Sequence, residues 1–155
     1  VDTGHGDQLV GYFLFAVVIP LVLGEYVFGK MTAKVGFRKM FFVGYGILAF
    51  FSFICFFVEN FYIKLGLLCL ASIGAAMIEP TCESYFFDIV SKTQRDKFYG
   101  PYNTSLDVGH IIAAFFGAVL LLFLDFKFLF LFYGAVVLIM ALISLKLKNV
   151  IEARR

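Results

Sequence analysis

Five polar side chains lie within otherwise apolar stretches of the sequence, where they could bind a solute or carry a proton. Glu79 and Glu83 are four residues apart, so a helix would place both on one face. Asn103, Asp107 and His110 follow one another at spacings of four and three, which again describes one helical face. Desolvation favours the protonated form of a carboxylic acid, and imidazole exchanges protons near neutral pH. We therefore predict a solute-binding or proton-coupling site built from these five residues.

Other uses of these residues stay open at the level of the sequence. Glu79 could be a structural carboxylate hydrogen-bonded to a neighbouring helix, and for His110 a packing role is favoured over a functional one. Clustered around a metal, Glu79, Glu83, Asp107 and His110 could also serve an intramembrane enzyme. We expect no enzyme, no cofactor and no resident metal. The three cysteines lack the spacing of metal ligands, and neither a Gly-rich phosphate loop nor a nucleophile elbow is present.

The elements that must position these residues are long apolar runs. The chain is 62% apolar and 15% charged, with a mean hydropathy of +0.95, whereas a soluble domain carries about a quarter charged residues. So few polar residues cannot cover a water-soluble globule. A backbone in lipid must satisfy its own hydrogen bonds, and none of the runs alternates as the strands of a barrel do. We predict an all-α polytopic membrane bundle.

One membrane domain over residues 1–155 is expected, with five transmembrane spans at about 9–28, 40–58, 61–90, 98–124 and 128–147. The second and fifth spans contain no charged residue from 40 to 58 or from 128 to 145. The other three contain every ionisable group at membrane depth, and such groups face a bundle interior or a wet cavity. We therefore expect the first, third and fourth spans to face inward and the second and fifth to face lipid.

The basic residues predict the orientation. Eleven of the thirteen Lys and Arg residues fall in three short segments, 30–39, 92–97 and 146–155, which alternate with the apolar runs. If every run crosses the bilayer, the three segments emerge on one side, and the positive-inside bias makes that side cytoplasmic. The N-terminus is then outside and the C-terminus cytoplasmic, in an integral protein of the plasma (cytoplasmic) membrane whose partner is the lipid bilayer. No arginine-rich tract lies outside these loops, which argues against nucleic acid.

The first basic segment carries the most specific motif. Two glycines and three basic residues occur there in a fixed order: Gly29, Lys34, Gly36, Arg38 and Lys39. The two glycines would permit a tight hairpin with positive φ. This order resembles the signature loop of the major facilitator superfamily. Ala33 departs from it, because that family usually has an acidic residue at this position.

The resemblance implies a fold and a function. Members of the family have two six-helix halves, in which the third and sixth helices are peripheral, and the two charge-free spans fall on those positions. The chain therefore resembles five helices of one half without the first, and the lost acid at Ala33 favours helices eight to twelve. Residues 1–8 carry no initiator Met and no basic n-region, so we expect the chain to begin inside a longer protein.

The function that the resemblance implies is that of a fragment of a secondary active transporter. It would move a small solute by alternating access, with the rest of the transporter as its partner and protons as a candidate coupling ion. A structural membrane subunit without a site of its own is the alternative.

The resemblance also implies a cytoplasmic gate. In the family, the signature loop bonds to an acid at the cytoplasmic end of the fourth helix of the half. By position this role falls to Asp88, with Glu83 as second choice and Arg38 or Lys34 as the partner. Arg95 in the second basic loop completes the predicted gate. The alternative is that Arg38 and its neighbour Lys39 only enforce topology.

Overall fold

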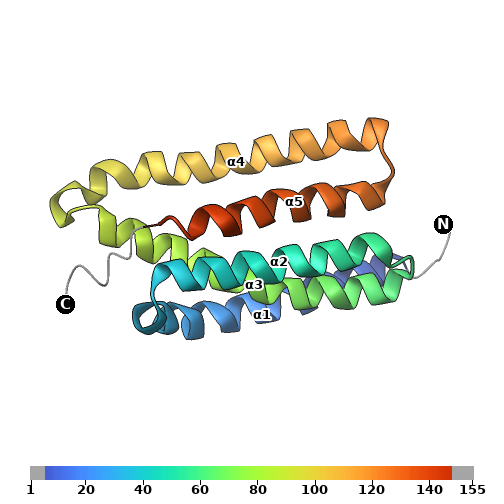
Figure 1. Ribbon diagram of the computed structural model, residues 1–155, viewed down its shortest axis with the longest axis horizontal. Helices are drawn as coiled ribbons and strands as arrows, with labels where there is room; N and C mark the ends of the chain where they lie inside the picture. The colour runs from blue at the N-terminus through green and yellow to red at the C-terminus, as the bar shows by residue number, and fades with distance from the viewer. Residues whose placement is uncertain (1–5, 148–155) are drawn as a thin grey trace.

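A computed structural model describes residues 6–147 of the chain and contains helices but no strand in that part (Figure 1). The elements in order are α1 Gly6–Val35, α2 Phe37–Phe57, α3 Phe61–Ile89, the 3-10 helix η1 Lys92–Gln94, α4 Arg95–Phe123 and α5 Phe126–Ser144. Lys148, Arg154 and Arg155, which belong to the third basic segment of the sequence, lie outside the described residues.

Each of the five α-helices is long enough and apolar enough to cross a membrane. A helix satisfies its backbone hydrogen bonds within itself, which is what a hydrocarbon environment demands. Asn60 caps α3 in the α2–α3 turn, where its side-chain oxygen accepts the backbone N–H groups of Tyr62 and Ile63 at 2.9 and 3.3 Å. The prediction of an all-α polytopic membrane bundle is confirmed.

The turns of the chain lie alternately at two ends of the bundle. The α1–α2 turn, η1 and the last turn of α5 lie at one end, on the left in Figure 1. The α2–α3 and α4–α5 turns lie at the other end, together with the start of α1. We name these the basic end and the opposite end, because the first holds residues 30–39 and 92–97. That the basic end faces the cytoplasm stays a prediction.

Helix α2 lies in the middle of the packed part, between α3 and α5. A core of Leu48, Ala49, Ala71 and Val137 joins the three helices. The prediction that the second span faces lipid is therefore wrong for α2. An apolar stretch without charge, such as α2 from residue 40 onward, suits a protein core as well as it suits lipid, so the absence of charge could not decide between the two.

Glycines set how closely the helices approach. At the α2–α3 crossing, a Cβ added to Gly74 would lie 2.6 Å from the carbonyl oxygen of Gly44. At the α1–α3 crossing, a Cβ added to Gly24 would lie 2.7 Å from the Cβ of Ala76. Small residues at such crossings allow the backbones themselves to meet, which is how helices associate in lipid.

Helix α4 is the least packed element. None of its residues is buried, and Figure 1 shows it joined to α3 at the basic end and far from α3 at the opposite end. Within the described residues no buried side chain of α4 bears on the expectation that the fourth span faces the interior of the bundle, so that expectation stays a prediction. Its contacts with the remainder are concentrated at the two turns that connect it to α3 and α5.

Candidate functional site

The turn between α1 and α2 consists of Gly36 alone. Its φ is 93° and its ψ is 146°, and it has the only positive φ among the described residues. The Gly36 N–H donates to the carbonyl of Thr32 at 3.0 Å, and the Gly36 carbonyl accepts from the N–H of Met40 at 3.2 Å. The positive φ expected for Gly29 is wrong, because α1 continues through it to Val35.

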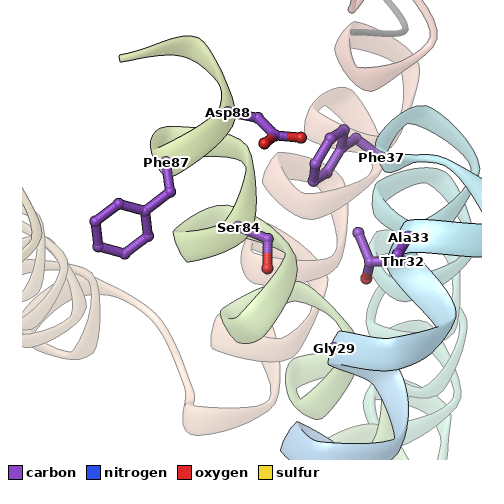
Figure 2. A pocket seen from close by; sticks show the side chains of 7 residues that line it. All are labelled: Gly29, Thr32, Ala33, Phe37, Ser84, Phe87 and Asp88. Carbon is purple, nitrogen blue, oxygen red and sulfur yellow. The ribbon is translucent and has the colours of Figure 1, made fainter. Parts of the chain in front are cut away.

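Beside this turn lies a cavity of about 430 Å³ at the basic end (Figure 2). It is formed where the end of α1, the start of α2 and the end of α3 meet, and its lining residues are Gly29, Thr32, Ala33, Phe37, Ser84, Phe87 and Asp88. Figure 2 shows the Asp88 carboxylate directed from α3 toward the Phe37 ring, while Phe87 extends to the other side of α3. The structure thus places the half-buried Asp88 next to the signature loop.

Thr32 in the wall of this cavity forms a buried contact with Thr81, which joins α1 to α3. The side-chain oxygens of Thr32 and Thr81 lie 3.0 Å apart, and the residues are 1% and 0% exposed. Thr32 also reaches the carbonyl of Phe28, and Thr81 the carbonyl of Met77. Two hydroxyl protons must serve three contacts, so one threonine donates to its partner and the other donates to its own helix.

The predicted basic residues of the gate differ in their surroundings. Lys34, Arg38 and Lys39 are exposed at the basic end. Arg95 is half-buried, donates from a terminal nitrogen to the carbonyl of Phe87 at 2.6 Å and stacks over the Phe87 ring at 5.2 Å. Arg95 therefore attaches the start of α4 to the end of α3.

Aromatic rings reinforce the same junction. Phe86 on α3 and Tyr102 on α4 stack with ring centroids 4.5 Å apart and planes 23° apart. Phe87 and Tyr99 form a second stacked pair at 6.1 Å. Offset stacking of this kind contributes about 1 kcal/mol beyond the burial of the rings. The basic ends of α3 and α4 are therefore held together.

The two predicted glutamates lie near this junction. Glu79 and Glu83 are exposed on α3, and both are within electrostatic reach of the Tyr102 side chain. Cys82 on α3 is within reach of Glu79 and of Tyr102 as well. The structure thus brings two of the predicted site residues to one place and adds a tyrosine from the next helix.

The other three predicted site residues do not join this group. Asn103, Asp107 and His110 are exposed on α4. In the part of the chain that the structure describes, no contact links Asp107 or His110 to Glu79. The shared cavity expected for Glu79 and His110 stays a prediction.

A larger cavity of about 840 Å³ lies between α3 and α4 on the side of the opposite end. Its walls come from all five α-helices and are almost entirely hydrocarbon, with small residues on the facing sides of α3 (Ala71, Ala75) and α4 (Ala113, Gly117). Ser72 also lines it, but its hydroxyl donates to the carbonyl of Cys69 at 2.7 Å. The cavity can therefore bind apolar groups by burial and offers little to polar ones.

Metal chemistry receives no support from these positions. Among residues 6–147, no group of three or more His, Cys, Asp or Glu side chains could hold a metal ion. The intramembrane enzyme considered from the sequence would need Glu79, Glu83, Asp107 and His110 in one cluster. The first two lie on α3 and the last two on α4, and they form no such cluster.

Three residues of the site were missed at the level of the sequence. Thr32 lies inside the signature loop but is not one of the residues of its motif, and its partner Thr81 lies 49 positions away. Tyr102 is not among the residues that the sequence singled out. Its place one residue before the polar stripe of α4 was the signal that it could face α3.

The chain matches the model of the Major Facilitator Superfamily over residues 2–154. No curated protein and no solved structure is similar enough to count as a match. The family model covers nearly the whole chain, and a membership of this family accounts for both the five membrane-type helices and the glycine turn at Gly36. The chain belongs to the major facilitator superfamily of membrane transporters.

Proposed function

We propose that the chain is part of a secondary active transporter that moves a small solute by alternating access. The family match over residues 2–154 carries this proposal. Two features of the structure support it. Carboxylates lie within α3, a helix long and apolar enough to cross a membrane, where ionisable groups are functional by default, and one cavity lies near each end of the bundle.

Glu79 is the group we propose for proton coupling. It is exposed on α3 one turn from the larger cavity, and its titratable neighbours are Cys82 and Glu83 on α3 and Tyr102 on α4. In this role Glu79 would carry a proton from one side of the membrane to the other when the access changes. Solute movement and proton movement would then share one cavity.

Asp88 is the acid we propose for the gate at the basic end. It lines the smaller cavity together with Ala33 and Phe37, next to the turn at Gly36 (Figure 2). The exposed Arg38 is the proposed partner, with Lys34 as the alternative. In the closed state of this end, the carboxylate and the cation would form an ion pair.

Reconstitution into proteoliposomes tests the transport proposal. Proteoliposomes that contain the longest available form of the protein are loaded with a pH-sensitive dye, and candidate solutes are added to the outside. A solute that is transported with protons should change the internal pH, and Glu79→Gln should remove the pH dependence of uptake. Glu59→Gln, an exposed acid in the α2–α3 turn, is the matched control. Uptake that keeps its pH dependence in Glu79→Gln contradicts the coupling role, while solute movement itself tests the transporter.

The orientation and the location in the plasma membrane are part of the proposal. The basic segments 30–39 and 92–97 are expected on the cytoplasmic side. In a variant whose three native cysteines are replaced, single cysteines at Arg38, Arg95 and Lys127 report the topology. Impermeant maleimide added to whole cells should label Lys127→Cys only. Labelling of Arg38→Cys but not Arg95→Cys would refute the five-span topology.

A further inference from the structure

The space between α3 and α4 has the form of a wedge. Its narrow end is the Phe86–Tyr102 stack at the basic end, where the ring centroids are 4.5 Å apart. Toward the opposite end the two helices separate, with α5 and α2 drawn between them in Figure 1, and the cavity of about 840 Å³ lies there with walls from α3, α4 and α5 and smaller parts of α1 and α2. A ligand that enters this wedge from the opposite end would contact the wide apolar cavity first and the aromatic pair last.

Charge is confined to the narrow end of the wedge. On α3 the cavity wall is formed by Leu68, Ser72 and Ala75. Glu79 follows Ala75 by four residues, so it continues the same helical face by one turn. Glu83 continues it by a second turn, up to Phe86. The acidic groups are thus in line with the apolar wall and end at the aromatic stack.

These two carboxylates have no cation to compensate them within the described residues. No lysine or arginine side chain forms an ion pair with Glu79 or Glu83 there, and the half-buried Arg95 at the start of α4 donates to the carbonyl of Phe87. Acids at membrane depth are expensive to leave unpaired. A guest that brings a positive charge would lower that energy, and the face of a Tyr ring also attracts cations.

We infer that the wedge binds a lipophilic organic cation, with its apolar body in the cavity between α3 and α4 and its positive charge beside Glu79 and Glu83. The inference rests on the proposed transport function, for which it names the class of solute. The two carboxylates favour a ligand with a positive charge, and the hydrocarbon walls favour a ligand whose remaining part is apolar. A sugar or another neutral polyol would find almost no hydrogen-bonding partner along those walls.

A pair of probes with the same shape and opposite charge tests this inference. Tetraphenylphosphonium and tetraphenylborate are dialysed to equilibrium against lipid nanodiscs that contain the protein, and binding to empty nanodiscs is subtracted. We expect saturable binding of tetraphenylphosphonium and none of tetraphenylborate. Glu79→Gln should weaken tetraphenylphosphonium binding about tenfold, because one of the two carboxylates is lost. Glu59→Gln should leave binding unchanged.

A second variant tests the apolar half of the site without touching charge. Gly117 lies in the cavity wall on α4, and a Cβ there would meet no atom within 4 Å. Gly117→Leu should therefore fold normally, as helix content by circular dichroism reports, and should fill part of the chamber. Weaker binding of tetraphenylphosphonium in Gly117→Leu supports the location, and unchanged binding overturns it.

Each remaining outcome is decisive. Equal binding of both probes, unaffected by Glu79→Gln, would show a nonselective apolar groove and overturn the inference. Binding of neither probe would show that a further helix of the protein or a lipid fills the wedge, which also overturns it. If neither probe binds and solute-driven pH changes are still seen in proteoliposomes, only the solute class fails. If tetraphenylphosphonium binds and no solute is ever moved, the transport proposal fails and the binding site stands.

Discussion

The close crossing of α2 and α3 makes a quantitative prediction about stability. Gly74 faces Gly44 so closely that a Cβ would lie 2.6 Å from the Gly44 carbonyl oxygen, 3.0 Å from Cγ of Leu48 and 3.2 Å from Cγ2 of Ile47. The nearest of these atoms belongs to the backbone and cannot rotate away. For Gly74→Ala the helices would have to separate by about 0.8 Å to restore an ordinary contact, which is overpacking that costs about 2 kcal/mol.

Gly66→Ala is the matched control on the same helix. A Cβ at Gly66 would meet no atom within 4 Å. Replacing a helical glycine by alanine contributes up to about 1 kcal/mol of stability through helix propensity, and this gain applies to both variants. The difference between Gly74→Ala and Gly66→Ala therefore isolates the packing term of about 2 kcal/mol, or roughly 30-fold in the unfolding equilibrium constant.

The assay is unfolding of the chain in mixed micelles with increasing sodium dodecyl sulfate, followed by circular dichroism. Both variants and the original chain are measured at the same detergent composition. Gly74→Ala should unfold at a lower fraction of sodium dodecyl sulfate than Gly66→Ala. Equal midpoints for the two variants would refute the claim that backbone contact between Gly44 and Gly74 fixes the distance between α2 and α3.

Three further changes probe the basic end. Gly36→Ala forces φ near 93° on a residue with a Cβ and should destabilise the chain by about 2 kcal/mol in the same assay, and no loss would mean that the turn tolerates another conformation. In a double-mutant cycle, Thr32→Val and Thr81→Val should show a coupling of about 0.6 to 1 kcal/mol, and additive effects would argue against the interhelical hydrogen bond. Tyr102→Ala should speed amide hydrogen exchange in the first turns of α4, whereas Tyr12→Ala, on an exposed face of α1, should leave it unchanged. Protection that survives in Tyr102→Ala would mean that the aromatic stack does not hold α4.

The number and type of the elements followed from the sequence, because in lipid the apolar runs have only one way to satisfy their backbone. The Gly36 turn followed too, since a glycine between two long helical runs is where the chain can reverse. The end of α1 did not follow from the sequence. The sequence placed it near Phe28, and the helix continues to Val35 because its basic residues are compatible with helix outside the hydrocarbon.

The arrangement of the helices could not be predicted from charge alone. Helix α2 carries no charge beyond Arg38 and Lys39 in its first turn, and it is central because Gly44 and Ala49 let α3 and α5 approach it. Helix α4 carries Asp107 and His110 and has no buried residue. Charge at membrane depth indicates that a residue needs a polar partner, but it does not say which helix supplies that partner. The contact between Thr32 and Thr81 joins positions that are far apart in the chain. Many other hydroxyl side chains could form such a contact, so the sequence does not single out this pair.

The two walls of the wedge are built differently, and this difference bears on mechanism. The α3 wall is fixed by backbone contact with α2 and by the buried Thr32–Thr81 contact with α1. The α4 wall is held mainly at its ends, by the Phe86–Tyr102 stack and by the short turn to α5. Segments with few buried contacts open at the lowest free energy. A change in access should therefore move α4 against a stationary α3, so that Glu79 keeps its position while the space beside it opens or closes. An acid placed on the rigid wall can act in both states, which a carboxylate carried by the moving helix could not do equally well.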